Sequence, residues 1–384
     1  MKVCFLSAYP PMSNADGYYT KRLINNLKKI SVESNLILPC PFKLKDAKIE
    51  YTYLGLFNWR ETFDFLKKTS PDIIHIIYSI HTYLSSTFHL WLLLVVHTKL
   101  LKIPVFVTIQ EAETWLRRLG FCGAVYYKLM SHFVDMFLVH AESSKQALVN
   151  NCKIPPTKVS HMFHGFHEIE PNTAPLEKIK TRWNLNENRV ILFFGFIRPS
   201  KGIENLIEAV RIIRENRLLS NFIVLIVGSV RKREGLLNKL FQKRDERYNK
   251  YLKELVKKYS LDKVVKFIEE FIPDEEVFSV FSLSDVVVLP YNSAEESGIL
   301  HIALSVPRPV IATNIGGIGE RLKNIGVLVP PKSPQSLAEA ITNVLSDNEF
   351  RENLIKRYTS LKESLSPIEI ARIHYNLYKN YVLE

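Results

Sequence analysis

The sequence predicts an α/β protein built from two doubly wound domains, and three observations carry this prediction. The chain has 384 residues, more than one hydrophobic core usually holds, so two domains are expected. Short β-branched runs alternate with longer stretches of helical period from end to end, which is typical of parallel βαβ units. A polar, proline-containing stretch near residues 168–180 has no period and separates two series of such units.

The predicted strands are short apolar runs, each followed by a segment long enough for a helix. In the first series they cover residues 3–7, 35–38, 72–78, 105–108, 136–140 and 159–163. In the second series they cover residues 190–195, 222–228, 264–268, 285–290, 309–313 and 326–329. Because parallel strands need helical crossovers, each series should form one sheet with helices on both faces.

These series set the expected domain boundaries. We place an N-terminal Rossmann-like domain over residues 1–170 and a C-terminal one over residues 171–366. Residues 202–216 predict an amphipathic helix in the second domain, since their apolar side chains recur at helical spacing. Residues 367–384 also have helical period, and we expect this last helix to return to the N-terminal domain, because its tyrosines need a partner surface.

The composition is that of a globular chain. Hydrophobic residues make up 47% and charged residues 23%, which excludes a disordered or low-complexity protein. The first residues do not resemble a signal peptide, and the longest apolar stretch, residues 88–96, is far shorter than the ~20 residues of a spanning helix. The four cysteines are scattered without a C-x-x-C pair, which indicates free thiols in a reducing cytoplasm.

The chain is basic, with 51 Lys and Arg against 39 Asp and Glu. A basic protein seeks phosphates, so its partner could be a nucleotide, a polyprenyl phosphate, an anionic membrane or a nucleic acid. Residues 231–266 alone hold 13 basic and 5 acidic residues. We interpret this run as a solvated face, while Arg231 or Lys232 could reach a ligand from the end of the preceding strand.

Two loops that follow predicted strands carry the residues best suited to chemistry. Arg198 and Lys201 lie between a strand and an amphipathic helix, where a guanidinium and an ammonium can hold a diphosphate. The alternative is a solvated basic loop. In the second loop, Ser297 and Gly298 can open a helix whose free backbone N–H groups form another anion site.

In this order and spacing, the loops resemble the C-terminal domain of retaining glycosyltransferase family 4, which has the GT-B fold. The resemblance continues through residues 70–75, 139–143, 271–276 and 309–317. It implies transfer of a sugar, with retention of configuration, from a UDP- or GDP-sugar to a glycan, glycolipid or lipid-linked acceptor. It also implies a donor on the C-terminal domain, an acceptor on the N-terminal domain, and no cofactor or metal, in keeping with the lack of an Asp-x-Asp pair.

The resemblance assigns roles to individual residues. Arg198 and Lys201 match the pair that contacts the donor diphosphate and stabilises the leaving group. The resemblance places Gly17 in a glycine-containing loop of the N-terminal domain. The residues implied to bind the donor are Gly17, His164, Gly195, Arg198, Lys201, Glu295, Ser297, Gly298 and Ile299.

The chain departs from the family in two places. Ala294 and Ile302 stand where the family has its E-x7-E glutamates, and Glu295 or Glu296 could replace the first, with Glu296 as the catalytic candidate. After the strand at residues 105–108 the family often has His-Asp, whereas this chain has Gln110-Glu111. Glu111 could orient the acceptor or serve as a base; the alternative is a capping loop without chemistry.

Several other interpretations stay open. The replaced glutamates favour a catalytically silent GT-B interaction subunit, and a sugar-nucleotide epimerase can use the same fold. Nucleic-acid binding through residues 231–266 is disfavoured, since no interleaved aromatics support it. Zinc at His161, His164 and His167 is disfavoured, because strand residues three apart face opposite sides.

The expected location is the cytoplasm, where the basic residues of the N-terminal half allow two interpretations. They could hold that domain against an anionic membrane at the inner face of the cell, or they could simply keep the protein soluble. Residues 88–96 likewise allow either a membrane-dipping face or a buried helix, of which we favour the buried helix.

Overall fold

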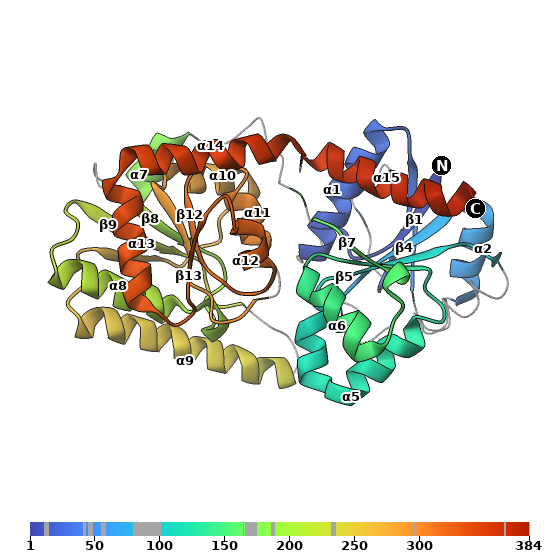
Figure 1. Ribbon diagram of the computed structural model, residues 1–384, viewed down its shortest axis with the longest axis horizontal. Coiled ribbons are helices and arrows are strands. Elements are labelled where there is room, and N and C mark those ends of the chain that lie inside the picture. Colours follow the sequence, from blue (N-terminus) through green and yellow to red (C-terminus); the bar gives the residue numbers. More distant parts are fainter. Residues whose placement is uncertain are drawn as a thin grey trace. The chain divides into compact units, whose positions relative to one another are not determined.

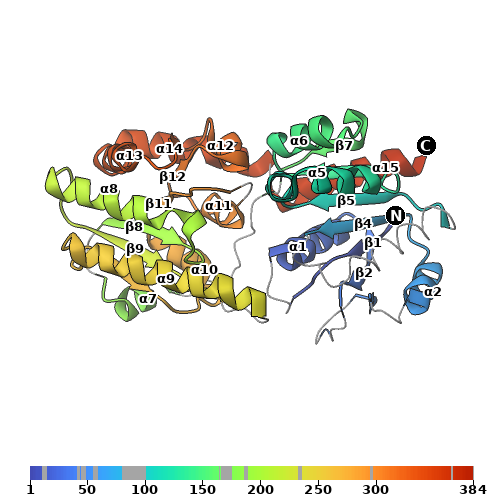
Figure 2. The same cartoon turned by 90° about the horizontal axis from the view of Figure 1, so that it is seen from below.

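The computed structural model divides into two compact units (Figure 1). Unit 1 consists of Met1–Gly165 and Leu365–Glu384, and unit 2 of Phe166–Ser364. The structure describes residues 1–10, 15–40, 44, 49–54, 59–79, 101–163, 165, 175–185, 189–231, 236–294, 297–364 and 366–383. Each unit is a parallel sheet with helices on both faces (Figure 2), which confirms the predicted fold class.

Unit 1 has a seven-stranded sheet in the order β3-β2-β1-β4-β5-β6-β7. Its strands are β1 (Lys2–Leu6), β2 (Glu33–Leu38), β3 (Tyr51–Tyr53), β4 (Ile73–Tyr78), β5 (Val105–Ile109), β6 (Met136–Val139) and β7 (Val159–His161). Its helices include α1 (Ala15–Lys29), α2 (Trp59–Thr69), α5 (Ala112–Met130), α6 (Glu142–Cys152), the 3-10 turn η2 (Pro156–Lys158) and α15 (Pro367–Leu383). Every residue of strands β4 and β5 is buried, because helices cover both faces of the sheet.

Unit 2 has a six-stranded sheet in the order β10-β9-β8-β11-β12-β13. Its strands are β8 (Arg189–Phe194), β9 (Phe222–Val227), β10 (Val265–Ile268), β11 (Val286–Leu289), β12 (Val310–Thr313) and β13 (Val327–Val329). Its helices include α7 (Leu176–Arg182), η3 (Pro199–Lys201), α8 (Ile203–Glu215), α9 (Leu236–Lys258), α10 (Asp274–Leu283), α11 (Gly298–Ala303), α12 (Gly316–Leu322), α13 (Pro334–Ser346) and α14 (Asn348–Ser364). The strand order reverses between β8 and β11, and ligands of such sheets bind at the carboxyl ends of the strands beside that reversal.

The structure differs from the sequence prediction at the expected linker and at one strand of unit 1. The stretch predicted as linker, residues 168–180, overlaps helix α7, which begins at Leu176 after Pro175 and has a single buried residue, Ile179. One buried side chain in seven residues gives no period to detect. Likewise β3 was not predicted, because its three residues are only partly buried.

Most of the basic run over residues 231–266 forms helix α9. The helix packs against α8, with Leu252, Leu255 and Val256 buried, while its many lysines lie outward. This agrees with the interpretation of the run as a solvated face.

Helix α15 packs on unit 1 through a buried polar cluster. On β4, His75 Nδ1 lies 2.5 Å from Tyr378 Oη, and His75 Nε2 lies 2.7 Å from Thr108 Oγ1. On α15, His374 Nδ1 donates to the Ile370 carbonyl at 2.8 Å, and its Nε2 lies 3.2 Å from Tyr19 Oη on α1. Since both imidazoles are fully buried, these bonds satisfy rings that must be neutral.

This cluster predicts a loss of stability in acid. Burial lowers the pKa of His374 to about 4, and burial with the neighbouring histidines lowers the pKa of His75 well below its usual value. The unfolded chain binds a proton near pH 6.5, so the free energy of unfolding should fall as the pH drops from about 6.5 to 4, by about 3 kcal/mol for His374 alone. Urea unfolding of unit 1 at pH 7.5, 5.5 and 4.5 measures this slope. His374→Gln should flatten it, and an unchanged slope in that variant would contradict the assignment.

Candidate active site

The candidate site lies in unit 2 at the carboxyl ends of β8 and β11. The loop after β8 contains Gly195, Arg198 and the turn η3, and it ends at Gly202, where α8 begins. The loop after β11 runs from Pro290 to Ser297, where α11 begins. The predicted basic loop and the predicted start of α11 therefore lie at the same place, where the strand order reverses between β8 and β11.

Lys201 is the most unusual side chain of this site. It is only 9% exposed, and its Nζ lies 3.5 Å from the centre of the Tyr291 ring. Burial first, and then the positive charge of Arg198, lower the pKa of the Lys201 ammonium well below its usual value. In the described part of the chain no carboxylate forms an ion pair with it. A nearly buried cation without a counterion is costly unless an anion binds there.

Arg198 lies at the entrance of the same loop. It is exposed, has an extended backbone and precedes η3, and its charge acts on both Lys201 and the Tyr291 hydroxyl. An exposed guanidinium above a buried ammonium offers an arriving anion two cations at different depths.

The amide of Asn292 holds the Lys201 loop in place. Its Nδ2 donates to the Pro199 carbonyl at 3.1 Å and to Glu204 Oε1 at 2.7 Å, while its backbone N–H donates to the Ser200 carbonyl at 2.9 Å. Tyr248 of α9 donates to Glu204 and accepts from the first N–H of α8, that of Ile203. The sequence carried no signal for Asn292, Glu204 or Tyr248, because their partners are up to 93 residues away.

Two glycines let the backbone segments of the site approach one another. At Gly202, with φ +59°, an added Cβ would lie less than 3.0 Å from the Pro290 carbonyl oxygen. At Gly228, with φ +143°, it would lie less than 3.0 Å from the Gly195 carbonyl oxygen. Both positions require glycine by conformation and by space.

Tyr291 connects the two loops. Its ring faces the Lys201 ammonium, and its hydroxyl lies 3.4 Å from Ser297 Oγ. Ser297 caps α11, accepting from the Leu300 N–H at 3.3 Å. Next along the helix, Ile299 would lie 3.6 Å from a Cβ built on Gly195, and nothing lies within 4 Å of one built on Gly298. The structure thus brings together Gly195, Arg198, Lys201, Ser297, Gly298 and Ile299, and their role in donor binding stays a prediction.

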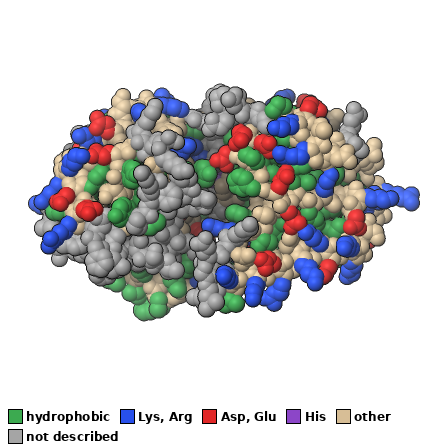
Figure 3. All heavy atoms as spheres, turned by 180° about the vertical axis from the view of Figure 1, so that it is seen from behind, with side chains coloured by type: hydrophobic (Ala, Val, Ile, Leu, Met, Phe, Trp, Pro, Cys, Tyr) green, Lys and Arg blue, Asp and Glu red, His purple; other side chains and the backbone are tan. Residues whose placement is uncertain are grey.

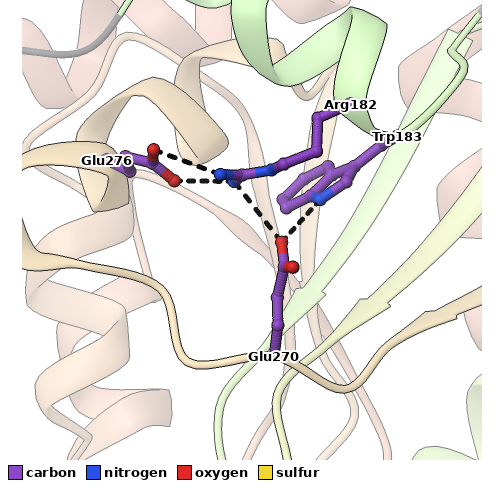
Figure 4. Close-up of polar contacts among 4 residues, drawn as sticks. All are labelled: Arg182, Trp183, Glu270 and Glu276. Atoms are coloured by element: carbon purple, nitrogen blue, oxygen red, sulfur yellow. Dashed lines mark hydrogen bonds and ion pairs between the residues drawn. The ribbon is translucent and has the colours of Figure 1, made fainter.

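A second network holds the loop after β10 at the same edge of the sheet (Figure 4). Arg182 donates two bonds to Glu276, at 3.2 and 2.6 Å, and lies 3.4 Å from Glu270. The buried Trp183 donates its indole N–H to Glu270 at 2.7 Å. Beside Glu270, Phe271 projects with 85% of its side chain exposed. These bonds tie helix α7 to β10 and α10 and fix the backbone that carries Phe271.

The remaining predicted residues lie elsewhere. Glu295, Glu296, His164 and Lys232 lie outside the described residues, as do residues 88–96. Gly17 was expected in a loop but lies, buried, in the first turn of α1, because Asp16 and its neighbours favour the start of a helix there. The Arg231 guanidinium lies over the Phe196 ring at 5.7 Å, so it stays beside the loop after β8.

In unit 1, Glu111 occupies the capping position before α5, directly beyond β5, and makes no side-chain capping bond. The preceding Gln110 has a buried Nε2 without a hydrogen-bond partner in the described part of the chain. A buried amide N–H that lacks a partner can donate a hydrogen bond to a hydroxyl of a bound acceptor. The pair Gln110-Glu111 therefore stays a candidate for acceptor binding.

Among the described residues, no group of three or more His, Cys, Asp or Glu is placed to hold a metal ion. His161 lies 3.6 Å from Glu142 and close to the His140 carbonyl, while His164 and His167 lie outside the described residues. None of the helices described by the structure is long and apolar enough to cross a membrane.

Residues 176–360 match the family described as Glycosyl transferases group 1. This match lies wholly within unit 2 and covers just under half of the chain. The matched stretch includes both loops of the candidate site, from Gly195 to Ile299. The family match supports the predicted glycosyltransferase activity, while family 4 and retention stay predictions.

Curated relatives agree with this family. An uncharacterized glycosyltransferase of Methanocaldococcus jannaschii is 27% identical over 297 residues, covering 72% of this chain and 70% of its own. The alpha-D-kanosaminyltransferase of Streptomyces kanamyceticus is 28% identical over 60% of this chain and 56% of its own. A D-inositol 3-phosphate glycosyltransferase of Corynebacterium urealyticum is 33% identical, over 42% of this chain and 36% of its own. The chain thus spans about two thirds of the first relative and less of the other two.

Solved structures share the fold across the whole chain. Anabaena HepE in complex with UDP superimposes with a TM-score of 0.76 at 14% identity, covering 99% of this chain and 100% of that one. A glycosyltransferase from Rickettsia africae gives a TM-score of 0.76 at 18% identity, covering 100% and 98%. At these identities the likeness concerns the fold.

Proposed function

We propose that the protein is a retaining glycosyltransferase whose donor, a nucleotide-diphosphate-sugar, binds at the carboxyl edge of unit 2. The observation that carries the proposal is the Lys201 ammonium, which is nearly buried, has no counterion among the described residues and has Arg198 beside it. A diphosphate supplies the anion that this pair lacks. HepE, which shares the fold, has been solved with UDP and with UDP-glucose, so a UDP-sugar is the first donor to test and a GDP-sugar the second.

In the proposed reaction, Lys201 and Arg198 stabilise the negative charge that develops on the departing diphosphate. A diphosphate oxygen accepts the proton of the acceptor hydroxyl on the same face of the sugar, and this geometry retains the configuration. Such a route needs no carboxylate nucleophile, so Ala294 and Ile302 in place of the family glutamates are compatible with catalysis. Glu296 at the donor and Glu111 at the acceptor stay proposed catalytic residues.

The test is transfer or hydrolysis of UDP-, GDP- and ADP-sugars by the purified protein, after thermal-shift screening selects the donor. Proton NMR of the product gives its anomeric configuration, and an inverted product would contradict the proposed route. Without acceptor, a changed sugar on an intact nucleotide would instead identify an epimerase. Donor binding with neither hydrolysis nor transfer would favour the catalytically silent subunit, which the replaced glutamates suggest.

We predict that catalysis needs no added metal. The sequence lacks an Asp-x-Asp pair, and two cations already occupy the place where a metal-dependent enzyme holds its ion against the diphosphate. Transfer rates should therefore be equal in EDTA and in manganese. Activity that disappears in EDTA and returns with manganese would overturn this prediction.

Donor binding should take up a proton. The pKa of Lys201 is lowered in the free protein by burial and by Arg198, and a bound diphosphate would raise it again. Above about pH 8 the phosphates of UDP are fully ionised, so any proton taken up on binding is taken up by the protein. The affinity for UDP should therefore fall as the pH rises. Calorimetric titration with UDP in two buffers of different ionisation enthalpy measures this uptake. The same uptake in Lys201→Met would assign it to another group.

A further inference from the structure

The Lys201 ammonium packs against the face of an aromatic ring. Figure 3 shows lysine and arginine side chains on one face of the molecule standing out from the surface, interspersed with Asp and Glu. Lys201 is different, since it is only 9% exposed and its Nζ lies over the Tyr291 ring, 3.5 Å from the ring centre. Among the described residues, no oxygen accepts a hydrogen bond from this ammonium and no carboxylate pairs with it. In that part of the chain, the negative face of the ring is therefore the group that attracts it.

The ring of Tyr291 is fixed in its place. Tyr291 is completely buried, its carbonyl accepts from Thr313 Oγ1 of β12 at 2.7 Å, and its hydroxyl lies 3.4 Å from Ser297 Oγ. The next two backbone N–H groups along the chain both donate to the Ser200 carbonyl, at 2.9 and 3.2 Å. Because Ser200 directly precedes Lys201, these bonds hold the loop of the ring and the loop of the ammonium against each other.

The other described charged groups beside Lys201 do not neutralise it. Burial lowers the pKa of the Lys201 ammonium, and the like charge of Arg198 lowers it further. Glu204 of α8 uses its two oxygens to accept from an amide of the neighbouring loop and from the Tyr248 hydroxyl of α9. The Tyr291 hydroxyl stays protonated, because burial raises its pKa to about 12. The ring of Tyr291 thus opposes the loss of the proton from Lys201 that burial and Arg198 favour.

We propose that Tyr291 is a positioning residue of the donor site, whose ring keeps the Lys201 ammonium charged and at a fixed depth until a diphosphate binds. The inference rests on the proposed function, because it takes the diphosphate as the anion. A ring suits this role better than a carboxylate does. A carboxylate would cancel the charge of the ammonium and repel the arriving diphosphate, whereas a neutral ring stabilises the ammonium and leaves its charge available.

Titration of Lys201 in the free protein tests the effect of the ring without a donor. With lysines carrying ¹³C at Cε, NMR follows each side chain through its deprotonation, and Lys201→Met identifies the Lys201 signal by removing it. Tyr291→Leu should lower the proton affinity of Lys201 about tenfold, the size expected for a ring and an ammonium out of water. Tyr291→Phe keeps the ring and should leave the proton affinity of Lys201 as it is. An equal fall in both variants would assign the effect to the hydroxyl and contradict the proposal.

A series of fluorinated rings separates the charge of the ring face from the packing of the side chain. Tyr291 is fully buried, so Tyr291→Leu leaves a cavity and lowers stability. Phenylalanines with an increasing number of fluorine atoms, placed at position 291 by suppression of a stop codon, keep nearly the same shape while the ring face becomes less negative. The proton affinity of Lys201 should fall stepwise along this series. The same proton affinity throughout would overturn the proposal, even where Tyr291→Leu does not fold.

The pH dependence of UDP affinity, measured by calorimetry, tests the connection to the donor. At low pH, where Lys201 is protonated in both proteins, Tyr291→Leu should bind UDP nearly as the wild type does, and at high pH about tenfold more weakly. A role in packing alone would lower the affinity equally at every pH. Tyr259→Leu is the matched control, because the exposed Lys258 lies over the Tyr259 ring at 5.4 Å, and it should leave UDP affinity unchanged.

The two measurements separate this proposal from the proposed function. If the wild type binds UDP and Tyr291→Leu keeps the wild-type pH dependence, the role of the ring is wrong and the proposed function stands. If the wild type binds no UDP while Lys201 still responds to the fluorinated rings, the proposed function is wrong and the effect of the ring on Lys201 stands.

Discussion

Replacing Lys201 by alanine should lower the rate of sugar transfer by about 10²–10³-fold while the protein stays folded. One donor aimed at charge that develops in the transition state is typically worth that much in a water-excluded site. Lys201 is nearly buried, stacked on Tyr291 and without a counterion in the described part of the chain, so its charge meets little solvent screening. Removing a buried cation that has no counterion among the described residues should even raise the melting temperature slightly.

Initial rates of transfer, compared with melting temperature, measure both effects. Lys250→Ala is the matched control, because this lysine is exposed on α9 and pairs loosely with Glu254 at 3.8 Å, and it should leave the rate unchanged. Arg198→Lys should lose part of the activity, since an ammonium cannot make the two parallel bonds of a guanidinium to a phosphate. A loss of less than about threefold in Lys201→Ala would remove Lys201 from the catalytic assignment, as would an equal loss in Lys250→Ala.

The position of Lys201 could be predicted from the sequence because it depends on the order of neighbouring elements along the chain. A buried apolar strand, a short loop with two cations and an amphipathic helix determine that the cations lie at the carboxyl edge of a sheet. The same logic located the strands, whose predicted and observed ends differ by at most two residues. Among the strands that the structure describes, only β3 was missed, since a partly buried strand of three residues has no pattern to detect.

What the sequence could not predict depends on partners that are distant along the chain. Asn292 reads as an ordinary loop residue until its amide is found bonded to Pro199 and Glu204. The role of Tyr291 follows only from the packing of its ring against Lys201, and the role of Glu270 only from Arg182 and Trp183. Gly17 was misplaced because a glycine near a helix start has the same local sequence as a glycine in a loop.

Gly228→Ala should remove donor binding and destabilise unit 2 by about 3 kcal/mol or more, the range of substitutions that combine backbone strain with a steric clash. The backbone at Gly228 has φ +143°, and the new Cβ would lie less than 3.0 Å from the Gly195 carbonyl oxygen. Since the obstacle is backbone, no side chain can rotate away from it. The ends of β8 and β9, paired from Arg189 with Phe222 to Phe194 with Val227, would have to separate.

The expected loss of donor binding follows from where that separation occurs. Gly195 begins the loop that carries Arg198 and Lys201, and its N–H donates to the Val227 carbonyl at 2.9 Å, one residue before Gly228. Moving this peptide would shift the Lys201 ammonium away from the Tyr291 ring. Gly298→Ala is the matched control for stability, because nothing lies within 4 Å of a Cβ built there. Thermal unfolding with and without UDP should show a lowered transition without UDP stabilisation in Gly228→Ala, against an almost unchanged transition in Gly298→Ala. A Gly228→Ala protein that unfolds at the wild-type temperature and is still stabilised by UDP would show that the two strand ends can separate without moving the site.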